Sequence, residues 1–238
     1  PAMRAPFKGL DGPNSFLIDI KPGIPASAKV ISFLPQSARV ISFTLYGRTF
    51  VSVEFIVQIY EIEAYLRCMS FNDVKGEIEL AVFSTSKVDK GLNVGRFYPN
   101  KGVGKLDDSK ILELSGVIKC LCKLLKSEDW HIEHLENGAP ILFENGVKSG
   151  SSISISHTIN NEGIAYSAVV LSKVQSRIGV DIVIKNDSRL ARIANRVMSD
   201  VEIETERLAE VWACKEAVFK ARGPGLDFKN DIKVEFLE

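Results

Sequence analysis

The sequence Ile-Gly-Val-Asp-Ile-Val-Ile at residues 178–184 predicts a buried β-strand that carries one acidic side chain. Because side chains alternate along a strand, Asp181 shares a face with Gly179 and Val183, and the isoleucines point the other way. An ionised carboxylate in so apolar a strand is costly unless a cation or hydrogen-bond donors meet it. Taken alone, the motif is equally compatible with a structural aspartate bonded to a turn amide or a nearby arginine.

A helix is predicted downstream, over residues 206–221, from its apolar spacing and from the glycines and proline that follow it. Glu216 lies one helical turn from Trp212 and one turn from Lys220. One interpretation is a surface ion pair between Glu216 and Lys220, worth only a few tenths of a kcal/mol. The neighbouring Trp212 and Phe219 favour partial burial of the acid instead.

Upstream of both motifs, a strand predicted over residues 152–156 ends in Ser156-His157. A histidine at the end of a strand is more often structural than a ligand. A serine-hydrolase role for Ser156 is excluded locally, because no Gly-x-Ser-x-Gly elbow surrounds it.

The order of these motifs resembles the 4′-phosphopantetheinyl transferase superfamily: Ser-His, then Gly-Val-Asp-Ile, then Trp-x-x-Lys-Glu-x-x-x-Lys. The surfactin-synthetase-activating type is more similar than the short holo-acyl-carrier-protein synthase type, because a helical segment and a Gly-x-Pro precede the Ser-His. The resemblance covers about residue 77 to the end of the chain. It implies transfer of the 4′-phosphopantetheine arm of coenzyme A to a serine of an acyl or peptidyl carrier protein, with release of 3′,5′-ADP.

The resemblance also implies roles for particular side chains. Asp181 and Glu216 would hold Mg²⁺, a cation that takes one or two carboxylates together with substrate phosphate and water. Lys220 would contact phosphate oxygens, Lys215 would assist in positioning or proton removal, and Glu216 would be catalytic with both lysines.

The coenzyme A site is implied in the same way. Ser156 and His157 match the pair that grips the 3′-phosphate in the family. Lys110 stands where a family arginine begins a helix and contacts the nucleotide, and Arg96 lies near a comparable basic stretch.

The sequence departs from the family pattern in several places. Val183 stands where many surfactin-type enzymes have a second acid, and Ala139 replaces the lysine of Gly-Lys-Pro. The interval from Asp181 to Glu216 is short. The chain stops soon after Phe236, where the family continues with further strands, and the strands predicted over residues 29–55 are extra relative to the family pattern. Two explanations fit: a C-terminal domain of a larger synthase with an upstream segment attached, or a permuted arrangement in which the early strands fill the missing places.

The expected fold is α+β, with antiparallel sheets packed against helices as in these transferases, and with pseudo-two-fold halves as one arrangement. We divide the chain into a β-rich segment of uncertain assignment (1–76), the N-terminal half of a transferase (77–150) and a C-terminal half with the metal and coenzyme A motifs (151–238). Strands are expected at 30–34, 39–46, 49–55, 77–83, 152–156, 164–171 and 177–184, the last three as a meander, and helices at 110–126, 188–198 and 206–221. Asp108 and Ser109 are the predicted N-caps of the first helix. The segment 131–134, which holds two histidines but no cysteine pair to complete a zinc site, is predicted to be a loop.

Composition agrees with a globular protein and limits the partners. The chain has 238 residues, of which 45% are apolar and 25% charged, and thirty basic side chains balance thirty acidic ones. No global charge therefore attracts nucleic acid or a membrane surface. Four cysteines without a paired pattern, no secretory signal and no long apolar run are typical of a cytoplasmic protein.

A basic stripe on the predicted helix 188–198 suggests where a carrier protein would dock. Arg189, Arg192 and Arg196 share one face, and carrier proteins are acidic around the modified serine. A simple solvated face is the alternative for this stripe. Two other functions also remain open: a catalytically silent relative that binds coenzyme A or a carrier domain, and an ordinary α+β protein with a chance motif. If the chain is part of a synthase, the carrier would be a domain of that synthase.

Overall fold

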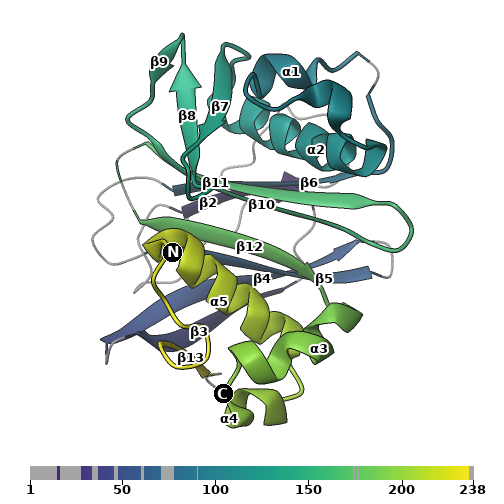
Figure 1. Ribbon diagram of the computed structural model, residues 1–238. Helices are drawn as coiled ribbons and strands as arrows, with labels where there is room; N and C mark the ends of the chain where they lie inside the picture. The colour runs from purple at the N-terminus through teal and green to yellow at the C-terminus, as the bar shows by residue number, and fades with distance from the viewer. Residues whose placement is uncertain are drawn as a thin grey trace.

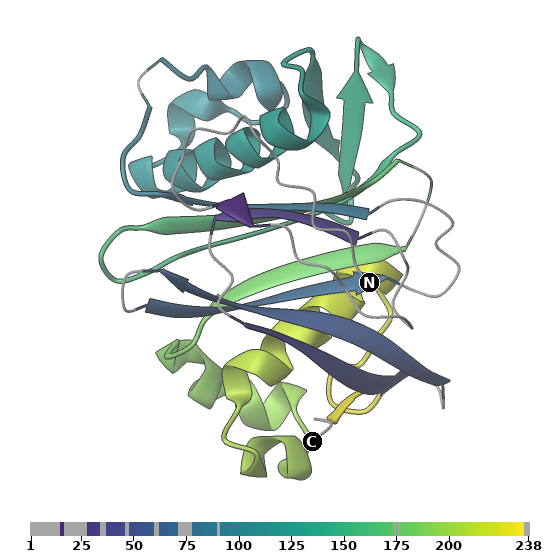
Figure 2. The same cartoon turned by 180° about the vertical axis from the view of Figure 1, so that it is seen from behind.

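The computed structural model describes residues 15–16, 28–33, 37–45, 48–59, 62–70, 78–89, 91–173, 175 and 177–235 (Figure 1). Its fold is α+β, as predicted, with two five-stranded sheets, a three-stranded sheet and helices packed against them. Seen from behind, α2 (Asp108–Leu125) and the three-stranded sheet lie at one end, and α3 (Ser188–Val197) and α4 (Asp200–Glu204) lie at the other (Figure 2). The two large sheets lie between these ends, and α5 (Leu208–Arg222) runs along the second of them.

The first large sheet has the order β1-β2-β6-β11-β10, antiparallel except for the parallel pair β2–β6. Its strands are β1 (Ser15–Phe16), β2 (Ala28–Phe33), β6 (Ile78–Thr85), β10 (Ser152–Ile159) and β11 (Ala165–Ser172). The β10–β11 hairpin turns over residues 160–163 as predicted, since Gly163 donates to the Asn160 carbonyl and adopts φ of 76°. Both edges of β11 are thereby occupied, one by β10 and one by β6.

Helix α2 (Asp108–Leu125) covers one face of this sheet. Its N-cap is Asp107, whose side chain accepts from the Lys110 amide at 2.7 Å, so the predicted caps at Asp108 and Ser109 were one or two residues too late. Gly116 permits close packing, because a Cβ there would lie 2.4 Å from Ser167 Oγ. The same serine hydroxyl donates to the Glu113 carbonyl at 3.0 Å, which fixes this turn of the helix on β11.

The second large sheet has the order β12-β5-β4-β3-β13 and is antiparallel throughout. Its strands are β3 (Ser37–Leu45), β4 (Arg48–Ile59), β5 (Ile62–Ser70), β12 (Ile178–Ile184) and β13 (Ile232–Glu235). The predicted meander is wrong at its third strand: β12 pairs with β5, because β11 has no free edge. This pairing agrees with the explanation in which early strands complete the sheet that carries Asp181. The division of the chain at residues 76 and 150 stays a prediction.

Helix α5 (Leu208–Arg222) packs directly on β12. A Cβ on Gly179 would lie 1.9 Å from the Ala217 carbonyl oxygen, so only glycine allows the helix this close to the strand. Helices α3 (Ser188–Val197) and α4 (Asp200–Glu204) cover the outer side of α5. The arginines of α3 are exposed and Leu190 is buried, as the sequence pattern predicts.

A small sheet of β7 (Trp130–His134), β8 (Pro140–Glu144) and β9 (Val147–Lys148) follows α2. The prediction of a loop at residues 131–134 was therefore wrong. Trp130 and Ile132 are buried and alternate with more exposed residues, a period of two that the histidines obscure. The short helices α1 (Val94–Phe97) and η1 (Val103–Lys105) precede α2. Among the described residues no helix combines the length and apolar character needed to cross a membrane.

The two large sheets meet where β10 lies against the open edge of β12. Ser154 Oγ accepts a hydrogen bond from the Val180 amide at 3.1 Å, and Ser156 Oγ accepts one from the Ile182 amide at 3.2 Å. Serine hydroxyls therefore take the place of a backbone ladder and satisfy amides that an edge strand would leave exposed.

Candidate functional site

Asp181 lies on β12 at the joint between the two sheets, and its charge is matched by neighbours. Its Oδ1 accepts from Ser156 Oγ at 2.7 Å and from Lys220 Nζ at 2.7 Å. Lys220 Nζ also donates to the Val180 carbonyl at 3.1 Å. The side chain of Asp181 is 9% exposed and that of Lys220 is 27% exposed, so the pair lies at the protein surface without being freely hydrated.

Glu216 faces the same pair from α5, one turn before Lys220. Burial raises the pKa of Glu216, the negative charge of Asp181 raises it further, and the Lys220 ammonium opposes both effects. Two carboxylates and one ammonium thus share one partly buried region, with a surplus of negative charge.

This surplus suits a divalent cation. Among the described residues no group of three or more His, Cys, Asp or Glu side chains could hold a metal, so any site here has two protein carboxylates at most. Both hydrogen bonds given for the Asp181 carboxylate end on Oδ1. Two carboxylates fit Mg²⁺, which completes its shell with water and phosphate oxygens. Val183 adds no ligand, because its side chain is a hydrocarbon, and it is buried with Leu190 and Ala213.

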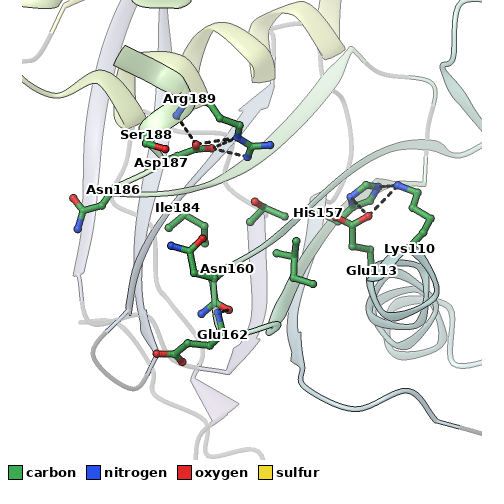
Figure 3. Close-up of a pocket in the computed structure, with 13 residues that line it drawn as sticks. Lys110, Glu113, His157, Asn160, Glu162, Ile184, Asn186, Asp187, Ser188 and Arg189 are labelled. Carbon is green, nitrogen blue, oxygen red and sulfur yellow. Dashed lines mark hydrogen bonds and ion pairs between the residues drawn. The ribbon is translucent and has the colours of Figure 1, made fainter. Parts of the chain in front are cut away.

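A pocket of about 680 Å³ opens between α2, the end of β10 and the start of α3 (Figure 3). One end is lined by Lys110 and Glu113 of α2 and by His157 of β10. The other end is lined by polar side chains of the β10–β11 turn and of the segment before α3, including Asn160 and Asn186. Its volume is within the range of small-molecule sites, and its lining is mostly polar and charged, with Ile159 and Ile184 as apolar members.

At the first end, three side chains form a closed triangle (Figure 3). Glu113 Oε2 lies 3.0 Å from Lys110 Nζ and 3.3 Å from His157 Nδ1, and Lys110 Nζ lies 3.2 Å from His157 Nε2. The contact with Nδ1 is close enough for an ion pair but is not aligned as a hydrogen bond. Burial alone would raise the pKa of Glu113, but His157 and Lys110 lower it to about 2, so this acid is ionised at neutral pH.

At the second end, Asp187 and Arg189 form an ion pair with each other. Asp187 caps α3 by accepting from the Arg189 amide at 2.9 Å, and its carboxylate also binds the Arg189 guanidinium, with the shortest contact at 2.6 Å. The Arg189 guanidinium is therefore part of a local ion pair as well as of the basic stripe on α3. Arg192 and Arg196 are exposed.

The structure separates Ser156 from His157, although the two are adjacent in sequence. Alternation along β10 turns Ser156 toward Asp181 and His157 toward α2 and the pocket. Of the residues expected at the coenzyme A site, it therefore brings Lys110 and His157 together and places Ser156 at the carboxylate pair. Arg96 does not line the pocket; it is exposed and contacts Glu128.

Lys215 is also separate from the carboxylate pair. Its ammonium is fully buried, 2.9 Å from Glu202 Oε2, and it donates to the carbonyls of Phe228 and Ile232. Burial lowers the pKa of Lys215, and Glu202 opposes this shift. The contacts tie α5 to α4 and to the segment that leads into β13.

Sequence reasoning missed Glu113, and it missed two basic residues, Lys101 and His134, that interact electrostatically with Lys110. Burial lowers the pKa of Lys101, and the positive charge of Lys110 lowers it further. The pKa of His134 falls for the same reasons, with Lys101 adding to the effect. The spacing of three between Lys110 and Glu113 was the available signal for the acid, whereas the positions of Lys101 and His134 depend on tertiary structure.

Comparison with known families gives a match in the C-terminal part of the chain. Residues 177–238 match the family model of the 4′-phosphopantetheinyl transferase superfamily. The superfamily resemblance is thereby confirmed for this segment, about a quarter of the chain. Neither a search of curated proteins nor one of solved structures finds a match.

The transferase match spans β12, α3, α4, α5 and β13. It includes Asp181, Glu216 and Lys220, so the carboxylate pair and its ammonium lie inside the matched segment. Lys110, Glu113 and His157 precede it, and the fold brings these three side chains together at the pocket.

Proposed function

We propose that this chain transfers the 4′-phosphopantetheine arm of coenzyme A to a serine of an acyl or peptidyl carrier protein and releases 3′,5′-ADP. The superfamily match supports a phosphopantetheinyl transferase in general terms. The observation that carries the specific proposal is the convergence of Asp181, Glu216 and Lys220, from a strand and a helix, at the joint between the two sheets.

Asp181 and Glu216 are the residues that would hold Mg²⁺. Bound there, the ion would polarise the attacked phosphorus and stabilise negative charge on the leaving 3′,5′-ADP. The residues of the site favour a bound cation, because two carboxylates near one lysine leave an excess of negative charge. Burial raises the free-energy cost of that charge.

Lys220 would bind the oxygens of the pyrophosphate. In the transfer, the serine oxygen of the carrier forms a bond to the phosphorus that carries the pantetheine arm, the bond from that phosphorus to the 3′,5′-ADP oxygen breaks, and the serine proton passes to a base. Negative charge grows on the leaving oxygens during this step, and a preorganised ammonium stabilises it. The contacts of Lys220 with Asp181 and with the Val180 carbonyl keep that ammonium at the site.

The nucleotide part of coenzyme A would occupy the pocket. Lys110 and His157 would contact the 3′-phosphate, and the amides of Asn160 and Asn186 at the opposite end offer donors and acceptors for the nucleoside. Ser156 would serve this site indirectly, since its hydroxyl fixes Asp181 and bonds the Ile182 amide. Lys215 would likewise position α5 through its buried ion pair, without contacting substrate.

For the protein partner, the exposed Arg192 and Arg196 of α3 offer positive charge beside the pocket. An acidic carrier protein is complementary to this surface. We place the reaction in the cytoplasm, which suits the free cysteines Cys120 and Cys122. The helix and hairpin that precede β10 support the surfactin-synthetase-activating type over the short type, and a carrier domain of the same synthase is one form that the partner would take.

The proposal is tested by Mg²⁺-dependent transfer of a fluorescent coenzyme A conjugate onto an apo carrier protein. Asp181→Ala and Glu216→Ala should each abolish transfer. Asp200→Asn is the matched control, because this carboxylate is 91% exposed on α4 and should leave the rate unchanged. Full transfer by either alanine variant contradicts the proposed site.

A second function, binding of coenzyme A or a carrier domain without catalysis, is favoured by one observation. The ion pair between Lys220 and Asp181 neutralises the aspartate without a metal, and Val183 supplies no further acid. A wild-type chain that binds coenzyme A in calorimetry but transfers nothing to several apo carriers would support this alternative.

A further inference from the structure

Glu113 is an acid in the part of the pocket assigned to a phosphate. Its side chain is 15% exposed, and its Oε2 contacts both cationic candidates, Lys110 at 3.0 Å and His157 at 3.3 Å. From charge alone, an ionised carboxylate at this place would repel a phosphate and weaken its binding. The arrangement therefore needs a reason other than charge complementarity.

We propose that Glu113 is a positioning residue that holds Lys110 and His157 as a fixed pair for the 3′-phosphate of the nucleotide. The inference rests on the proposed function, since it concerns the same pocket. It adds a residue outside the matched family segment, and it assigns an acid a favourable part in anion binding.

The distances among the three side chains support a positioning role for Glu113. Each of the three side chains contacts the other two, and the Lys110–His157 distance of 3.2 Å brings two groups together that would repel each other if both were charged. A carboxylate that touches both reduces that repulsion and restricts their rotamers before the ligand arrives, which lowers the entropy lost on binding.

The backbone under Glu113 is equally fixed. Its carbonyl accepts from the buried Ser167 hydroxyl, and the missing side chain of Gly116 lets α2 approach β11 closely. Because the pKa of Glu113 is held at about 2, its carboxylate stays ionised at every pH near neutrality. A side chain on a rigid, packed element can orient its neighbours within narrow limits.

The pocket offers a matched comparison. Glu162 also lines it, but its side chain is exposed and its carboxylate makes no hydrogen bond or ion pair with any residue that the structure describes. Removing the charge of Glu162 should therefore leave binding unchanged or make it slightly tighter. Removing the charge of Glu113 should have the opposite effect if the residue acts by positioning.

The test is calorimetric titration of 3′,5′-ADP and of 5′-AMP, which lacks the 3′-phosphate, into the wild type, Glu113→Gln and Glu162→Gln. We expect Glu113→Gln to weaken 3′,5′-ADP binding about tenfold, which corresponds to the loss of one hydrogen bond to a charged group. Binding of 5′-AMP should stay unchanged, so the preference for the 3′-phosphate falls by the same factor. Equal or tighter binding of 3′,5′-ADP by Glu113→Gln overturns the inference.

Two further variants keep the result interpretable. Glu113→Asp retains the charge but shortens the arm, so it should also weaken 3′,5′-ADP binding; wild-type affinity in this variant contradicts positioning. In a His157→Ala background, Glu113→Gln should cost much less than in the wild type, because one partner is already gone. If the wild type does not bind 3′,5′-ADP, the proposed function itself is overturned. If the wild type and Glu113→Gln bind 3′,5′-ADP with the same affinity, only the role of Glu113 is overturned.

Discussion

Replacing Gly179 by alanine should separate the two elements that build the carboxylate pair. The new Cβ would lie 1.9 Å from the Ala217 carbonyl oxygen and 2.9 Å from its carbonyl carbon, both in the backbone of α5. Ordinary contact begins near 3.4 Å, so α5 must retreat by roughly 1.5 Å or β12 must bend. Neither movement can be absorbed by a side-chain rotation.

The expected magnitude follows from that displacement. Overpacking of a core costs about 1–3 kcal/mol, and a loss near the upper limit lowers the Tm of a chain of this size by roughly 6–12 °C. Glu216 and Lys220 move with α5, away from Asp181. Because a misplacement of ~1 Å can cost about 10²-fold in rate, transfer of the arm should fall by at least that factor.

Thermal unfolding followed by calorimetry and the fluorescent transfer assay measure the two effects separately. Gly150→Ala is the control, because a Cβ there would meet nothing within 4 Å, and its Tm should match the wild type. Wild-type Tm and wild-type transfer in Gly179→Ala would refute the claim that close approach of α5 builds the site.

Three further predictions concern the other charged groups. The pKa of Glu216 is raised in the folded protein, so ionisation of this side chain opposes folding. Glu216→Gln should therefore unfold at the same temperature as the wild type near pH 3.5 and at a higher temperature near pH 8. A variant that is less stable than the wild type near pH 8 contradicts this prediction. Lys215→Met leaves Glu202 buried without its cation and should cost about 3–5 kcal/mol in chemical denaturation, whereas a folded variant with normal stability and lost transfer would indicate a direct catalytic role. Charge reversal by Arg192→Glu should raise the KM for the carrier protein and leave calorimetric coenzyme A binding unchanged; unaltered carrier kinetics would reject α3 as the docking surface.

Local patterns were sufficient to predict the elements that carry the carboxylate pair. The strand around Asp181 and the helix around Glu216 were predicted within two residues of their observed ends, because periodicity and a Gly-Pro-Gly stop are local signals. Gly179 was visible as part of the motif, but its contact with Ala217 requires the strand and the helix to be placed together.

Long-range pairing could not be predicted in the same way. The partner of β12 is β5, more than a hundred residues earlier in the chain, and no local pattern records which edge is free. The separation of Ser156 from His157 was implicit in strand alternation, yet the family motif presented them as one unit. The contact of Glu113 with His157 likewise depends on how α2 lies on β10, which the sequence of α2 alone does not determine.

The order of strands in the second sheet has a consequence for synthesis of the protein. Its outermost strands, β12 and β13, emerge from the ribosome long after β3, β4 and β5. A nascent chain therefore holds three strands with two open edges until β12 has emerged, and one open edge until β13 has emerged, and open edges invite pairing with other chains. Asp181 and Glu216 would meet only in the last moments of production, so we expect yield in cells to depend on chaperones that shield those early strands.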